Sequence, residues 1–319
     1  MTWRTLALTV THAQESFPPQ ADFETHTMGL YFHGQFGFSL AKYNEFFVSD
    51  LPTYAAFRFG SVEVTFGQPS PLIVYMFETY RDKHFHGDWD NLTTVRIYGC
   101  TKDEAEMVLL NSFDHYEAKF AVLPRTVEVG AIEWADIPEF DRTEVESTVQ
   151  QFPSSVIGDI EPLRCMYYAK TNAEPAAACI QYYRVLEYYA FFSLSQELNS
   201  LRRDATVSDR AFLLAAAQLL TKDEKGPIMK LISAVATREM LTLAADSNLI
   251  RRPEANLLAF AIYDFRNSIV HAKQDQRFVL TVDPVVSGPT STSVWRRILH
   301  QLAKAVFQHS ASRRFVGGV

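Results

Sequence analysis

Residues 263–273, with the sequence YDFRNSIVHAK, contain three side chains capable of phosphate chemistry. The guanidinium of Arg266 can bind a phosphate through two parallel hydrogen bonds and stabilise charge on a pentavalent phosphorus. The imidazole of His271 can move a proton near neutral pH. Asn267, one helical turn before His271, could orient that imidazole or a substrate oxygen. Together these residues predict RNA cleavage in which a 2′-hydroxyl attacks its neighbouring phosphate without a metal.

The same segment lies in a helix predicted over residues 254–273. At 100° per residue, one face of this helix is apolar and should pack on a core; it carries Leu258, Ile262, Phe265, Ile269 and Ala272. Relative to that face Asn267 lies at about 180°, His271 at about 220° and Arg266 at about 80°. The outer face also carries apolar residues, namely Phe260, Tyr263 and Val270. A second apolar face predicts burial against another helix or a second subunit, so a site at a dimer interface would suit the pattern.

Each of these residues also has an ordinary interpretation. A lone histidine usually belongs to the core, and Arg266 could form a salt bridge, for example to Glu187. An arginine followed five residues later by a histidine is also common by chance, since Arg81 and His86 repeat the spacing. We expect that second pair in a Gly- and Asp-rich loop of an acidic region, where phosphate would be repelled.

The first part of the chain has the pattern of a β-rich domain. To about residue 129, short β-branched and aromatic runs are bounded by Gly, Pro and Asp, which predicts an antiparallel sheet, sandwich or barrel. The runs are LALTVTHA, MGLYFHGQFGFSL, YAAFRFG, SVEVTFG, LIVYMFETY, TTVRIYG and RTVEVGAIEW. Thr101 followed by Glu104 is a capping-box pattern, and it predicts a helix over about 102–120.

After Pro175 helical periodicity replaces alternation. The predicted helices cover about 176–201, 208–221, 226–246, 254–273 and 291–309, with caps such as Ser208, Asp223 and Pro253. Helices with short connections predict a bundle. Residues 136–163, which are acidic and contain prolines, predict a linker or crossover. We therefore expect an α+β chain, with a β-rich domain over 1–150 and a helical bundle over 165–319.

The net charge divides unequally between the two parts. The whole chain of 319 residues has a formal charge of −7, which alone disfavours a nucleic-acid partner. By count, residues 1–160 have 10 basic and 23 acidic side chains, a net charge of −13, whereas residues 161–319 have a net charge of +6. The basic part contains Arg266 and His271. Four arginine pairs in it could guide RNA or simply cap helices: 202–203, 251–252, 296–297 and 313–314.

Other motifs are weak. Cys100, Cys165 and Cys179 form no CxxC pair and suggest free thiols in a reducing cytoplasm, and no signal peptide or membrane span is expected. His84 and His86 on a strand could bind a metal with Asp88 or Asp90, but a polar hairpin loop is the simpler interpretation. No phosphate loop and no GxSxG motif is found, so we expect no cofactor.

In its helical part, the chain resembles the HEPN superfamily, and in particular its Apea-like branch. Arg266, Asn267 and His271 match the Arg-x(4–6)-His motif, including the polar residue that commonly follows its arginine. The earlier sequence QYYRVLEYYAFFSLSQEL is similar to that branch's first helix, with Glu187 at the acidic position. The resemblance covers about residues 175–309 and does not extend to the first half of the chain. It implies a dimeric bundle of four or five helices, acting as a metal-independent endoribonuclease that leaves 2′,3′-cyclic phosphate ends, often in antiviral defence or toxin–antitoxin systems.

The expected roles follow from the residues and the resemblance together. His271 is the expected general acid and base, Arg266 binds the scissile phosphate, and Asn267 and Glu187 support the geometry. The 254–273 helix would form the homodimer, while the acidic first half would sense a trigger ligand or protein, or restrain the nuclease. One alternative is a non-catalytic module that binds RNA, a nucleotide or a partner. A weaker alternative is a metal-dependent hydrolase that uses His84 and His86.

Overall fold

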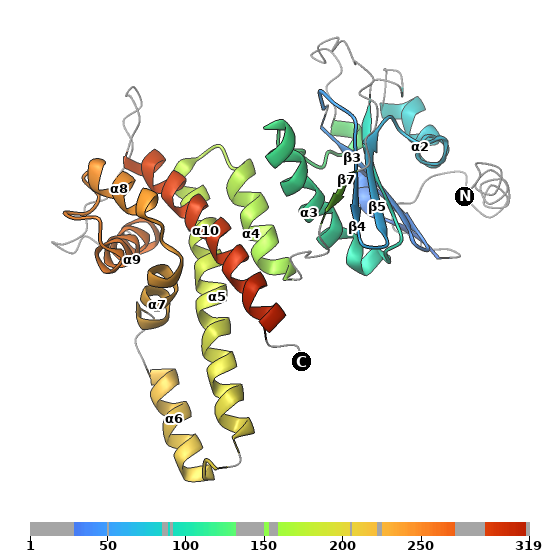
Figure 1. Ribbon diagram of the computed structural model, residues 1–319. Coiled ribbons are helices and arrows are strands. Elements are labelled where there is room, and N and C mark those ends of the chain that lie inside the picture. Colours follow the sequence, from blue (N-terminus) through green and yellow to red (C-terminus); the bar gives the residue numbers. More distant parts are fainter. Residues whose placement is uncertain are drawn as a thin grey trace. The chain divides into compact units, whose positions relative to one another are not determined.

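The computed structural model describes residues 29–49, 51–84, 89, 92–131, 150–152, 159–204, 206–221, 225–271 and 291–316. Within these ranges the side chains of residues 78–84, 131, 150–152, 192–197, 218–221, 270–271 and 311–316 are not described. The chain divides into two compact units, Met1–Gly158 and Asp159–Val319. The first contains a β-sheet and the second is helical, so the α+β prediction is confirmed at this level (Figure 1).

The first unit is built on one sheet. Its strands are β1 (Leu30–Phe32), β2 (Gly37–Leu40), β3 (Tyr43–Val48), β4 (Ala55–Phe59), β5 (Val62–Gly67), β6 (Thr93–Tyr98) and β7 (Gln150–Phe152). They lie in the order β1-β2-β3-β6-β5-β4-β7. The first six are antiparallel, and β7 pairs in parallel with β4. Gly60 lies in the turn between β4 and β5 at a φ of +60°, a conformation that glycine adopts without strain.

Two predicted strands are wrong. The run LIVYMFETY forms helix α2 (Pro71–His84). Ser70 begins it by accepting a hydrogen bond from the Ile73 amide on its Oγ at 3.2 Å, and proline fits the first helical position. In its described part, residues 125–131, the run RTVEVGAIEW contributes only an isolated bridge between Thr126 and Val48 and a 3₁₀ turn (Val129–Ala131). The predicted run LALTVTHA lies outside the described residues.

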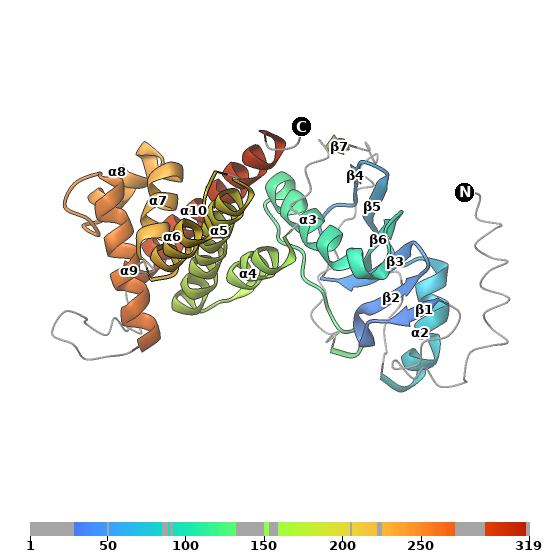
Figure 2. The same cartoon turned by 90° about the horizontal axis from the view of Figure 1, so that it is seen from below.

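Helices α2 and α3 (Lys102–Phe120) cover opposite faces of the sheet (Figure 2). On one face Phe77 of α2 packs edge-on against Phe47, with 5.1 Å between ring centroids. On the other, Tyr116 of α3 packs against Phe66 at 4.9 Å. The predicted capping box is present, since Glu104 accepts hydrogen bonds from the Thr101 amide and hydroxyl, both at 2.9 Å. The helix predicted over 102–120 is therefore confirmed.

A fully buried carboxylate, Glu45 of β3, ties the sheet to α2. It accepts hydrogen bonds from the Ser70 amide at 2.9 Å and the Thr94 hydroxyl at 2.8 Å, and also from the Tyr43 and Ser70 hydroxyls. Burial and the adjacent carboxylate raise the pKa of Tyr43 far above its usual value. Tyr43 therefore remains a donor, and four donors compensate the charge of Glu45.

The second unit contains seven helices within the described residues. They are α4 (Ile160–Thr171), α5 (Pro175–Arg203), α6 (Asp209–Thr221), α7 (Lys225–Val235), α8 (Arg238–Asp246), α9 (Ala255–His271) and α10 (Ser291–Val316). The helix predicted over 226–246 is wrong as a single element. It breaks before Thr237, whose hydroxyl caps α8 by accepting from the Met240 amide at 3.3 Å. The linker predicted over 136–163 is also wrong in part, because it contains β7 and the start of α4.

Helix α5 is the centre of this unit and packs against α4, α7, α9 and α10. Its core residue Leu186 is fully buried, as are Ile232 of α7, Ile262 of α9 and Leu302 of α10. Phe265 of α9 stacks on Trp295 of α10, with 4.9 Å between the ring centroids. Among the described helices, none combines the length and apolar character needed to span a bilayer.

Candidate functional site

Helices α5 and α9 bring three of the side chains at the candidate site together. Arg266 Nη2 of α9 lies 3.5 Å from Glu187 Oε1 of α5, and Arg266 Nη1 donates to Asn267 Oδ1 at 3.1 Å. The guanidinium carbon lies 5.6 Å from the ring centroid of Tyr183, one turn before Glu187 on α5. Tyr183 is buried, whereas the side chains of Arg266 and Glu187 are 23% and 38% exposed. The guanidinium is thus held in one orientation at a position that solvent reaches.

The folding of α9 places Arg266 as its periodicity predicts. Leu258, Ile262 and Phe265 are buried, so the predicted core face is confirmed at these positions. Arg266 follows on the flank of that face, where it can contact α5, and Asn267 is half-buried. On the outer face Phe260 is 46% exposed, whereas Tyr263 is half-buried, and the side chain of Val270 lies outside the described part.

His271 is the last residue of α9, and the placement of its side chain lies outside what the structure describes. The helix is continuous from Ala255 to His271, so Arg266 and His271 share one rigid element. The angle between Arg266 and His271 around the helix is still the one predicted from the sequence. Tyr183 had not been predicted as a site residue. The signal that could have found it is its spacing of four residues before Glu187, which puts both on one face of a helix.

The electrostatics at the site are mixed. Glu187 partly compensates the charge of Arg266, while Arg184 on the same helix is exposed. Lys225, at the start of α7, places its ammonium 4.5 Å from the ring centroid of Tyr263 on α9. The predicted salt bridge between Arg266 and Glu187 is therefore present, and a half-exposed pair of this kind stabilises a fold by only about 1 kcal/mol or less. Its main effect is to orient the guanidinium.

The arginine pairs differ in their surroundings. Arg296 Nη2 donates to three carbonyls at the end of α4, those of Ala169 and Lys170 at 3.4 Å and of Asn172 at 3.0 Å. It therefore caps a helix other than its own and is half-buried, which differs from the solvated cap considered for this pair. Exposed side chains are found at Arg202, Arg203, Arg251, Arg252 and Arg297. The side chains of Arg313 and Arg314 lie outside the described part.

The structure places His84, a residue of the alternative metal site, in a helix. His84 is the last residue of α2, so the strand assumed for it is wrong, and Arg81 lies in the same helix rather than in a loop. His86, Asp88 and Asp90 lie outside the described residues. Among those that are described, no three His, Cys, Asp or Glu side chains gather in a cluster that could hold a metal ion.

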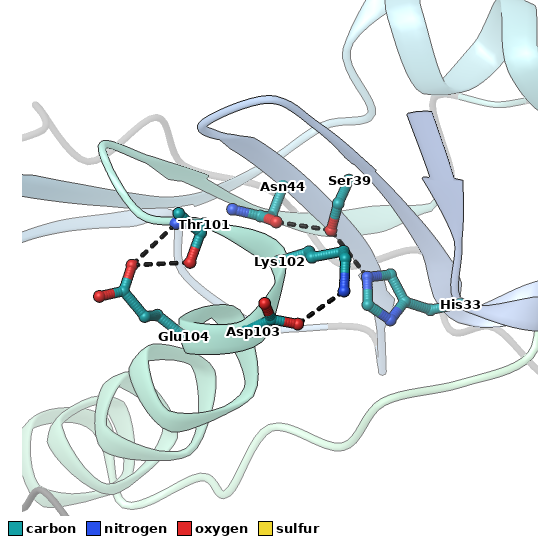
Figure 3. A network of polar contacts seen from close by, with 7 residues as sticks. All are labelled: His33, Ser39, Asn44, Thr101, Lys102, Asp103 and Glu104. Atoms are coloured by element: carbon teal, nitrogen blue, oxygen red, sulfur yellow. Dashed lines mark hydrogen bonds and ion pairs between the residues drawn. The ribbon is translucent and has the colours of Figure 1, made fainter. Parts of the chain in front are cut away.

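A buried polar chain in the first unit had not been predicted. Figure 3 shows His33, Ser39 and Asn44 in sequence: His33 Nε2 lies 2.7 Å from Ser39 Oγ, which donates to Asn44 Oδ1 at 2.5 Å. Because the single Ser39 proton goes to Asn44, His33 must donate to Ser39 and cannot act as its base. Ser39 is also 1% exposed. This serine–histidine contact is therefore structural and cannot support nucleophilic catalysis.

Comparison with known proteins assigns no role to the candidate site, so its role is inferred from the chemistry of its residues. The helical unit offers an oriented and accessible guanidinium, and the first unit offers a sheet with helices on both faces. No family model, curated protein or solved structure matches the chain.

Proposed function

We propose that the helical unit is a metal-independent endoribonuclease. The observation that carries the proposal is the fixed guanidinium of Arg266, held by Glu187, Asn267 and Tyr183 on the helix that ends in His271. A guanidinium with this orientation suits bidentate binding of a phosphate, and a histidine on the same helix supplies acid–base chemistry.

In the proposed reaction the 2′-oxygen of a ribose attacks the adjacent phosphorus. The bond from phosphorus to the 2′-oxygen forms as the bond to the 5′-oxygen breaks. His271 takes the proton from the 2′-hydroxyl and gives it to the leaving 5′-oxygen, which yields a 2′,3′-cyclic phosphate and a 5′-hydroxyl. Arg266 stabilises the charge on the pentavalent phosphorus. Glu187 and Asn267 are positioning residues for Arg266.

The test is cleavage of total RNA in EDTA, with detection of cyclic phosphate ends. We expect the wild type to cleave, and Arg266→Ala and His271→Ala each to lower the rate at least about 100-fold. Glu187→Gln should lower kcat while the fold is retained. Arg81→Ala and His86→Ala are matched controls, because they have the same spacing elsewhere in the chain and should leave the rate unchanged.

Two outcomes would contradict the nuclease. Activity that requires added metal and survives His271→Ala would assign cleavage to another site, such as one with His84 and His86. RNA that is bound and remains intact with every variant would support a non-catalytic binding module. Toxicity on expression that His271→Ala relieves would extend the proposal to a toxin-like or antiviral role.

A further inference from the structure

Helix α5 carries an exposed aromatic ring, that of Phe191, one helical turn after Glu187 of the candidate site. Arg184, Glu187, Tyr188 and Phe191 occupy positions i, i+3, i+4 and i+7 of α5, so they form a stripe on one side of the helix. Phe191 is 69% exposed, more than any other large hydrophobic side chain among the described residues. Leaving such a ring in water forgoes substantial hydrophobic stabilisation, which favours a role in binding.

Phe191 lies one helical turn further along α5 than the residue that contacts Arg266. Glu187, which contacts Arg266, precedes Phe191 by four residues, a rise of about 6 Å along the helix. A ligand whose phosphate is bound by Arg266 would therefore extend its next planar group toward the phenyl ring.

The neighbours of Phe191 favour a planar ligand over a protein surface. On the preceding turns of the same stripe the side chains are polar: half-buried Tyr188, Glu187 at 38% exposed, and exposed Arg184. A stable protein interface needs a contiguous patch of roughly 800 Å² on each partner with an apolar centre. An exposed phenyl ring that follows charged side chains on the same stripe suits a nucleobase, whose flat face stacks on it while its phosphate is bound nearby.

We propose that Phe191 is the stacking platform for the base of a nucleotide next to the phosphate bound by Arg266. This inference rests on the proposed function, and it names a binding residue that neither the motif nor the site geometry had included.

The experiment measures binding of a fluorescein-labelled 12-nucleotide single-stranded RNA in the His271→Ala background, so that cleavage does not interfere. Phe191→Ala and Phe191→Leu should weaken binding about tenfold or more, and Phe191→Trp should preserve it. The leucine variant keeps an apolar side chain and removes only the aromatic face. Tyr168→Ala on α4, where the ring is 57% exposed, is the matched control and should bind as the parent does.

A set of RNAs with one abasic ribose at successive positions locates the stacked base. One position should weaken binding to the parent protein by the same factor as Phe191→Ala, and should have no further effect on that variant. Equal binding by Phe191→Ala and its parent overturns this inference alone, whether or not the wild type cleaves RNA. Absence of cleavage with binding that depends on Phe191 overturns only the nuclease. Conversion of a dimer to a monomer by Phe191→Leu would assign the ring to a second copy and overturn the proposal.

Discussion

At the scale of single residues, burial decides which groups can react. Cys100 is 3% exposed, and burial raises the pKa of its thiol to about 11. Asn44, also buried, donates to the Cys100 carbonyl at 3.1 Å and lies 3.5 Å from its Sγ. The Cys100 thiol is therefore a structural part of the core, in contrast to the accessible guanidinium of Arg266.

The raised pKa of Cys100 predicts slow alkylation of its thiol in the folded protein. At pH 8 the thiolate fraction of Cys100 should be about 100-fold lower in the folded protein than in urea, because two pKa units separate about 11 from the ordinary value of 9. Mass spectrometry after iodoacetamide treatment reports each cysteine peptide separately. Since the folded pKa is raised, the thiol also stabilises the fold below pH 9, and this stabilisation is lost as the pH rises toward 11. Rapid alkylation of Cys100 in the native protein would show that the burial is wrong.

At the scale of elements, the end of helix α4 is capped by a side chain distant in sequence. Three carbonyls at the end of α4 receive the guanidinium of Arg296 from α10. A cation at a helix C-terminus also interacts favourably with the helix dipole. One arginine thus joins the first and last helices of the second unit.

Replacing Arg296 with alanine should lower the free energy of unfolding by about 1 to 3 kcal/mol, because three carbonyls lose a charged donor. Arg297→Ala, at the neighbouring exposed position, should change it by less than about 0.5 kcal/mol. Urea unfolding followed by circular dichroism measures both values. Equal stability of the two variants would mean that the Arg296 contacts contribute nothing.

Features with local signals could be predicted from sequence, whereas most of those with tertiary causes could not. The capping box at Thr101 and the apolar face of α9 depend on residues a few positions apart, and both were predicted. β3 was missed because Asn44 and Glu45 interrupt its alternation, and their partners lie in β2, β6 and the start of α2. The contact between Arg266 and Glu187 was foreseen, but the capping role of Arg296 depends on carbonyls more than 100 residues away.

At the scale of the whole molecule, the chain forms two compact units with separate cores. The first core lies between the sheet and helices α2 and α3, and the second lies around α5. The boundary after Gly158 lies two residues before position 160, so nearly all of the −13 belongs to the first unit and nearly all of the +6 to the second. The acidic and basic parts therefore correspond closely to separately packed bodies.

Separate cores predict two unfolding transitions. Thr101→Ala removes the capping hydroxyl of α3 and should destabilise only the first unit, by about 1 kcal/mol. Arg296→Ala should shift only the other transition, and the double variant should show both shifts unchanged. Differential scanning calorimetry resolves the two events. A single transition that moves with either substitution would indicate that the units unfold together.

The length of helix α5 connects α6 with the candidate site. Its 29 residues form a rod about 43 Å long, to which α4 and α10 are packed, while α6 contacts chiefly α5 and lies beside its last turns (Figure 1). Leu213 and Leu214 of α6 are 65% and 59% exposed. A force on α6 would therefore be transmitted to α5. The same helix carries Tyr183 and Glu187, which contact the guanidinium of Arg266.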